Sequence, residues 1–171
     1  MSKTKKISRT AALIGGLAAA ALIFSYVEAL IPSVAIPGIK LGLANAATVI
    51  LLYYLDAPTA FSVSAIRILL SSLLFGSALS WVYAVSGGIL SFLGMYLLKR
   101  VRCFSVLGVS ISGGILHNLG QLAAASILFD YPLYVTLYLP ILLIAGTAAG
   151  ALVGFTAVFV LRRLPNKNHL G

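Results

Sequence analysis

The chain has 171 residues, of which 61% are hydrophobic and 9% are charged, and its mean hydropathy is +1.09. A soluble domain of this size cannot hide so much apolar surface from water, so the composition excludes an ordinary soluble protein and indicates a bilayer. The 12 Lys and Arg residues outnumber the 3 Asp and Glu residues, and most of them stand at the ends of apolar segments. This placement is typical of membrane topology and argues against a nucleic-acid-binding surface.

Six apolar segments follow one another along the chain. In order they cover residues 11–31, 41–55, 59–75, 79–98, 104–129 and 133–161. Because strand-like alternation is lacking and each segment must satisfy its own backbone in hydrocarbon, we expect an all-α membrane bundle of about six transmembrane helices. These helices form a single domain over residues 11–162, between a basic N-terminus at residues 1–10 and a basic C-terminus at residues 163–171.

Two of the segments depart from a simple span. The second, residues 41–55, would be about 22 Å long as a helix, which is short of a roughly 30 Å hydrocarbon core. We therefore expect it either to be tilted together with a neighbouring loop or to be partly buried in the bundle. The sixth contains Pro140, which predicts a kink or an interfacial first part.

The Lys and Arg residues gather at the N-terminus, in the connection at residues 99–103 and at the C-terminus. These three regions share one side of the membrane if the number of spans is even, and the positive-inside rule makes that side cytoplasmic. We expect a multi-pass protein of the cell membrane with both termini in the cytoplasm. The single Cys103 excludes an internal disulfide, and its basic surroundings place it on the same reducing side.

Ionisable and polar residues inside a membrane are costly, and they are therefore candidates for function. Arg67 lies deep in the third segment, where it either forms a structural ion pair, for example with Glu28, or contacts a ligand or its counter-ion. The fifth segment carries His117, Asn118 and Gln121 at spacings that let them share one helix face. These three side chains serve either hydrogen bonds between helices or a ligand.

The first connection adds three further candidates, Glu28, Lys40 and Asn45, around a stretch that contains two prolines and a glycine at residues 32–38. This composition predicts an ordered outer loop. Together with Arg67 and the polar group of the fifth segment, these residues predict a pocket that opens outward. Its positive charge favours an anionic or zwitterionic ligand.

Small residues form two ridges on the first segment. They recur at every fourth position and let another helix approach closely, either within the bundle or in a partner protein. The ridges consist of Ala11, Gly15 and Ala19, and of Ala12, Gly16 and Ala20.

The acidic residues are too few for enzyme chemistry on a diphosphate. Glu28, Asp56 and Asp130 are scattered along the chain, whereas a Mg²⁺–diphosphate site needs paired carboxylates. The sequence also lacks a metal-binding His/Cys group and a Gly-rich phosphate loop. We expect a non-enzyme without metal or cofactor, and any active transport must draw its energy from a gradient or from a partner.

Two strings carry a family resemblance: Lys40 to Asn45 (KLGLAN) after the proline-containing loop, and Ser112 to Gln121 (SGGILHNLGQ) in the fifth segment. With the six short segments and the small-residue first helix, they resemble the Gx transporter family over roughly residues 10–162. That family is often labelled heptaprenyl diphosphate synthase component I. It is similar to the substrate-binding S components of energy-coupling factor (ECF) transporters.

The resemblance implies a binder that takes a small molecule from outside and works with a transmembrane coupling subunit and two cytoplasmic ATPases. It also implies that the ridges between Ala11 and Ala20 are the docking surface for the coupling subunit. Two other hypotheses stay open: a non-catalytic membrane accessory of polyprenyl diphosphate or quinone synthesis, and a purely structural bundle. The sequence does not identify the substrate.

Overall fold

The structure of the chain is a computed structural model, and it describes residues 3–30, 40, 42–101, 103–129 and 133–165. Six helices and no strand are present in these residues. The helices are α1 (Lys3–Leu30), α2 (Asn45–Tyr54), α3 (Ala57–Phe75), α4 (Ala78–Arg100), α5 (Val106–Phe129) and α6 (Leu133–Arg163). The predicted all-α bundle is confirmed. The predicted ordered loop at residues 32–38 lies outside the described residues.

In the part of the chain that the structure describes, four helices are long and apolar enough to cross a membrane. They are α1 from Ile7 onward, α3, α4, and α6 from Leu137 onward. Helix α5 has 24 residues, but its three central polar side chains reduce its hydropathy. The chain is therefore a membrane protein, as its composition predicts.

Helix α2 has only ten residues, about 15 Å at the rise of an α-helix, so it cannot cross a bilayer by itself. Val49, Leu51 and Leu52 at its centre are fully buried. The Lys99 ammonium of α4 donates a hydrogen bond to the Leu52 carbonyl in the last turn of α2, where a cation is favourable to the helix dipole. Of the two expectations for this segment, burial in the bundle is correct.

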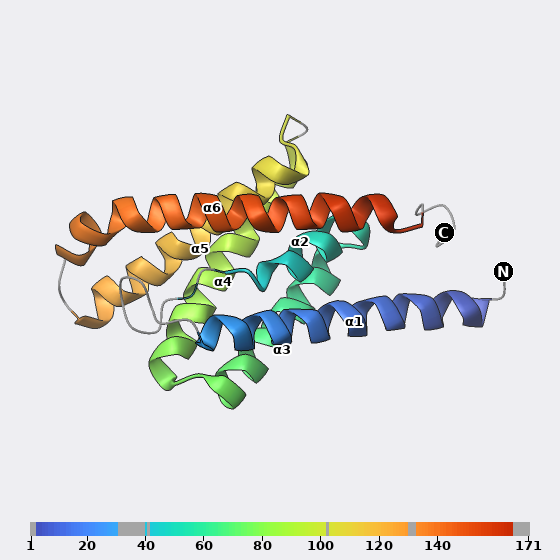
Figure 1. The fold of residues 1–171 in the computed structure, drawn as a ribbon, viewed down its shortest axis with the longest axis horizontal. Helices are drawn as coiled ribbons and strands as arrows, with labels where there is room; N and C mark the ends of the chain where they lie inside the picture. Colours follow the sequence, from blue (N-terminus) through green and yellow to red (C-terminus); the bar gives the residue numbers. More distant parts are fainter. Residues whose placement is uncertain (1–2, 31–39, 41, 102, 130–132, 166–171) are drawn as a thin grey trace.

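Figure 1 shows how the helices surround this short central one. Helices α1 and α6 run along the long axis, and the start of α1 and the end of α6 lie at the same end of the molecule. Helix α2 packs against both α1 and α6 and also against α3. Pro140 lies inside α6, which continues without interruption from Leu133 to Arg163.

Helices α4, α5 and α6 pack through glycines. A Cβ at Gly114 of α5 would lie 2.3 Å from the carbonyl oxygen of Gly146 in α6. A Cβ at Gly120 would lie 2.7 Å from the Ser86 carbonyl oxygen in α4. These distances are far below van der Waals contact, so the backbones of α5 and its two neighbours approach one another only because side chains are missing.

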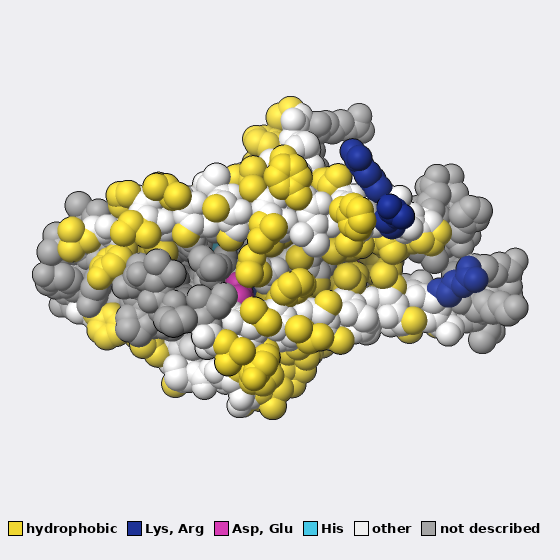
Figure 2. All heavy atoms as spheres, viewed as in Figure 1, with side chains coloured by type: hydrophobic (Ala, Val, Ile, Leu, Met, Phe, Trp, Pro, Cys, Tyr) yellow, Lys and Arg dark blue, Asp and Glu magenta, His cyan; other side chains and the backbone are white. Residues whose placement is uncertain are grey.

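The outer surface is mainly apolar. In Figure 2 the Lys and Arg side chains on the visible face lie toward the end where α1 begins and α6 ends, and hydrophobic side chains are spread over the rest of the described surface. Such a distribution suits a protein whose middle is surrounded by hydrocarbon and whose end reaches water.

Candidate functional site

The polar residues singled out in the sequence converge on one region of the bundle, although they come from four different parts of the chain. Six of the seven are buried, and Lys40 is half-buried. They are Glu28 in α1, Lys40 before α2, Asn45 at the start of α2, Arg67 in α3, and His117, Asn118 and Gln121 in α5.

Arg67 connects three helices. Its guanidinium Nη2 donates a hydrogen bond to Asn45 Oδ1 at 3.2 Å, and Nη1 donates to Ser25 Oγ at 3.4 Å. Glu28 lies one turn after Ser25 on α1, and its charge attracts that of Arg67. Helix α3 thus presents its cation to polar groups of α1 and α2, and not to the lipid.

The Gly-Leu-Ala-Asn string forms the turn that enters α2. Gly42 has a φ of +86°, a conformation that L side chains rarely adopt. The Gly42 carbonyl accepts a hydrogen bond from the Asn45 amide at 3.0 Å. The amide of Leu43 donates to Glu28 Oε1 at 2.5 Å. This turn therefore places Asn45 toward Arg67, and the Leu43 amide fastens the turn to α1.

The His-Asn-Leu-Gly-Gln string of α5 meets the same turn from the other side. The Gln121 side chain accepts a hydrogen bond from the Lys40 amide at 2.8 Å and donates one to the Lys40 carbonyl at 2.9 Å. The His117 ring packs so closely that a Cβ on Gly42 would lie 3.0 Å from its Cδ2, and a Cβ on Gly87 of α4 would lie 3.0 Å from its Nδ1. The two strings of the resemblance are therefore in direct contact.

Asn118 points in a different direction from its two neighbours on α5. Its Nδ2 donates a hydrogen bond to the Leu142 carbonyl in α6 at 2.8 Å. His117 and Gln121 thus face Lys40 and Gly42, whereas Asn118 faces α6. One of the two alternatives for this group, hydrogen bonding between helices, describes Asn118 well.

Five buried polar atoms of this cluster have no hydrogen-bond partner among the described residues. They are Lys40 Nζ, Asn45 Nδ2, Arg67 Nε, His117 Nδ1 and Asn118 Oδ1. Leaving one buried group of this kind unpaired costs about 1–3 kcal/mol. Three of the five atoms, those of Lys40, Asn45 and Arg67, can only donate, so the cluster can accept a group that carries several hydrogen-bond acceptors.

The electrostatics of the cluster agree with this surplus of donors. Two cationic side chains, Lys40 and Arg67, act on a single carboxylate, Glu28. Burial lowers the pKa of Lys40, and the nearby Glu28 carboxylate works in the opposite direction. A cavity of about 10 Å³ borders Asn45, between α2, α4, α5 and α6, which is the space of roughly one water molecule.

Two participants were not predicted from the sequence. Ser25, which receives a hydrogen bond from Arg67, is 1% exposed. Its position three residues before Glu28 on α1 was the available signal, because residues with that spacing lie on one helix face. Gly87 gives the His117 ring its space, and nothing in the sequence around it indicates that role.

The small-residue ridges of α1 lie apart from this cluster. Five of their six residues are exposed and Ala20 is half-buried. A Cβ at Gly15 or Gly16 would meet no atom within 4 Å. The residues of the ridges are Ala11, Ala12, Gly15, Gly16, Ala19 and Ala20. The described parts of the chain also contain no group of three His, Cys, Asp or Glu residues that could hold a metal ion.

Comparisons with known proteins complete this description. Searches of curated proteins and of solved structures gave no match. A family model described as heptaprenyl diphosphate synthase component I matches residues 17–160, which include all seven residues of the polar cluster. The chain therefore belongs to the heptaprenyl diphosphate synthase component I family.

Proposed function

We propose that this protein is the substrate-binding membrane subunit, or S component, of an ECF-type uptake transporter for a small molecule. The observation that carries the proposal is the buried cluster around Arg67, in which Lys40 Nζ, Asn45 Nδ2 and Arg67 Nε have no acceptor among the described residues. A structural bundle gains nothing from burying unpaired donors, because each one reduces stability. A ligand with carboxylate, phosphate or carbonyl oxygens would satisfy them.

Lys40 and Leu43 connect the cluster to the chain that enters α2. The amide and carbonyl of Lys40 bond to the Gln121 side chain, and the Leu43 amide donates to Glu28 Oε1. Exchange of these hydrogen bonds for contacts with a ligand would couple binding to the positions of Lys40 and Leu43.

The exposed ridges of α1 are the proposed docking surface for a transmembrane coupling subunit. Most of α1 is not covered by the protein itself, since 11% of its apolar window is buried. Small residues on such a face allow another helix to approach closely. Two cytoplasmic ATPases bound to the coupling subunit would then supply the energy.

The proposed location is the cell membrane, with both termini in the cytoplasm. Lysines and arginines stand at three helix ends: Arg9 of α1, Lys99 and Arg100 of α4, and Arg162 and Arg163 of α6. These ends share one side of the membrane when α2 and the chain that enters it together count as one crossing and the other helices cross in alternate directions. The positive-inside rule makes this side cytoplasmic.

The description of the family favours a second candidate function. Its words, heptaprenyl diphosphate synthase component I, point to a subunit of a prenyl synthase. The chain itself would act there without catalysis, as a membrane accessory that holds a lipid precursor, because its three acids are scattered and the Mg²⁺–diphosphate chemistry needs them clustered.

Two variants separate substrate binding from partner docking in the proposed transporter. The protein is isolated gently from its own membranes, and the bound small molecule and the co-purified ATPases are measured for each variant. Arg67→Ala should lose the small molecule and keep the ATPases, because the substitution leaves the ridges of α1 intact. Gly15→Leu should keep the small molecule and lose the ATPases.

Thermal unfolding in detergent shows whether each variant is folded. A folded Arg67→Ala protein that retains the small molecule would remove Arg67 from the binding site. A Gly15→Leu protein that retains the ATPases would remove α1 as the docking surface. Gly15→Ala, which adds a methyl group in open space, is the matched control and should behave as the natural protein.

A further inference from the structure

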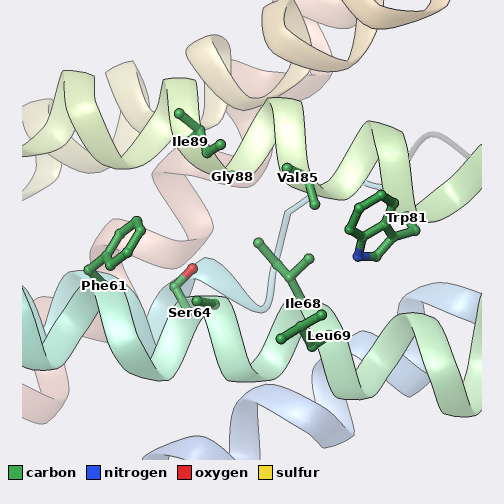
Figure 3. A pocket seen from close by; sticks show the side chains of 9 residues that line it. Phe61, Ser64, Ile68, Leu69, Trp81, Val85, Gly88 and Ile89 are labelled. Atoms are coloured by element: carbon green, nitrogen blue, oxygen red, sulfur yellow. The ribbon is translucent and has the colours of Figure 1, made fainter.

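A groove separates α3 from α4 on the outer surface of the bundle, away from the polar cluster. It has a volume of about 150 Å³, and its lining is almost entirely apolar. Figure 3 shows the side chains of α3 and α4 that face each other across it. The residues that shape it most are Phe61, Ala65 and Ile68 of α3, and Trp81, Val85 and Gly88 of α4.

A small residue leaves the space for this groove, and aromatic side chains close its two ends. Gly88 contributes no side chain, and a Cβ there would lie 2.6 Å from Ile68 Cδ1. At one end the ring of Phe61 contacts that of Phe92, with 5.2 Å between the ring centroids. Trp81 stands at the other end, near the turn between the helices. The groove is thus elongated along the two helices and bounded at both ends.

A second hollow continues the groove toward the α3–α4 turn. It has a volume of about 380 Å³ and shares Leu69 and Trp81 with the first. Ser72 and Ser77 also line it, so it is more polar than the groove. The two hollows together are apolar along the helices and polar at the turn, which is the profile of a lipid with a chain and a headgroup.

The medium that meets the groove is the bilayer. Both α3 and α4 are candidate membrane spans, and 33% of the apolar window of each is buried in the protein. Water in the groove would find few polar partners, and an empty groove would forfeit dispersion contacts. An apolar cavity of about 150 Å³ holds a benzene-sized group, so this one takes a segment of one hydrocarbon chain.

We propose that the α3–α4 groove is a lipid-binding site that holds one acyl chain of a bilayer phospholipid, with the headgroup in the hollow at the α3–α4 turn. Trp81 lies between the apolar and polar parts, as interfacial tryptophans do in membrane proteins. The site is independent of the proposed transport function. Arg67 is next to Ile68 in the chain, but its guanidinium bonds to Ser25 and Asn45 on the other side of α3.

Trp81 provides a direct readout because it is the single tryptophan of the chain. The full-length protein is reconstituted into vesicles of phosphatidylcholine in which one acyl chain is dibrominated at its middle, and tryptophan fluorescence is compared with that in unbrominated vesicles. Ala65→Leu fills the groove from α3 and should weaken the quenching of Trp81. Ala148→Leu, the same substitution at an exposed position of α6, should leave the quenching unchanged.

Native mass spectrometry of the same proteins then counts retained phosphatidylcholine molecules. The natural protein and Ala148→Leu should retain one molecule that Ala65→Leu loses. Gly88→Ala is a second test, because its methyl group displaces only the flexible end of Ile68 into the groove, and it should also lose the lipid. Equal quenching and equal retention in all four proteins would overturn the proposal. So would retention of a prenyl lipid in place of phospholipid by protein taken from its own membranes.

Discussion

Gln121 holds the segment before α2 against α5 with a single side chain. Its amide oxygen and nitrogen bind the N–H and the C=O of Lys40 at 2.8 and 2.9 Å. These two residues are 81 positions apart in the chain, so the contact depends on the whole fold. Gln121 itself is fully buried, which prevents water from replacing either hydrogen bond. Lys40 can therefore leave the cluster only by breaking both.

Replacing Gln121 by Leu tests this role. The change retains the approximate shape of the side chain and removes both hydrogen bonds. Each bond contributes about 1 kcal/mol, and about 1.4 kcal/mol corresponds to a tenfold change in an equilibrium. We expect hydrogen exchange of the Lys40 amide to become at least about tenfold faster, as measured in detergent by mass spectrometry with electron-based fragmentation.

Asn118→Leu is the matched control for this experiment. It removes another buried amide from the same helix, but one that bonds to Leu142 in α6. Exchange at Lys40 should therefore stay at the natural rate in Asn118→Leu. If Gln121→Leu also exchanged at the natural rate, the two hydrogen bonds would not be what restrains Lys40.

At the scale of whole elements, the close contact between α5 and α6 depends on glycines, which carry no side chain. A Cβ at Gly150 would lie 2.7 Å from Ile111 Cα and 2.8 Å from the Ser110 carbonyl oxygen. The Ser110 hydroxyl also donates to the Gly150 carbonyl at 2.8 Å. Because the obstructing atoms on α5 belong to its backbone, only a separation of the two helices could make room.

Gly150→Ala should consequently destabilise the bundle, although Ala is a better helix former than Gly. Overpacking of a tight interface costs about 1–3 kcal/mol, and we expect a lower midpoint of thermal unfolding in detergent. Gly15→Ala makes the same change on the open face of α1 and should leave the midpoint equal or raise it. Equal decreases in the two variants would contradict the packing argument.

Much of this architecture is predictable from hydropathy, because the bilayer requires each spanning segment to be helical and apolar. The helix from Ala57 to Phe75 agrees with the expected third segment within two residues at its start. The position of α2 was less determined. Its length excluded a simple span, but a tilted and a buried helix fit the sequence equally well. The choice between them rests on contacts with α1, α3 and α6.

The candidate site is also predictable from the sequence only in part. A polar side chain inside a membrane costs free energy, and this cost identifies Arg67, His117 and Gln121 as candidates without any structure. The hydrogen-bond partners of these residues are not predictable in this way, because Ser25 and the main chain of Lys40 resemble many other groups in the sequence. Packing between distant parts of the chain determines which groups become the partners.

At the scale of the whole molecule, the single cysteine reports the orientation in the membrane. Cys103 is exposed in the connection between α4 and α5. If the termini are cytoplasmic, and α2 with the chain that enters it counts as one crossing, this connection is cytoplasmic too. A membrane-impermeant maleimide should then label Cys103 only after the cells are permeabilised.

A cysteine at the opposite end provides the control. Ser77 is exposed at the α3–α4 turn, and the double variant Cys103→Ser, Ser77→Cys should be labelled in intact cells. Labelling of Cys103 in intact cells, with Ser77→Cys protected, would reverse the proposed topology. In that case the polar cluster would open toward the cytoplasm, and an uptake role for it would be lost.

The central claim is that the cluster around Arg67 binds a small molecule for transport by partner ATPases. Native mass spectrometry of the protein purified gently from its own membranes tests this claim most directly. We predict one water-soluble ligand per chain, together with a coupling subunit and two ATPases; a phospholipid in the α3–α4 groove would be found in addition. A bound polyprenyl species together with a soluble prenyl synthase, and no ATPase, would contradict the claim and support the accessory role.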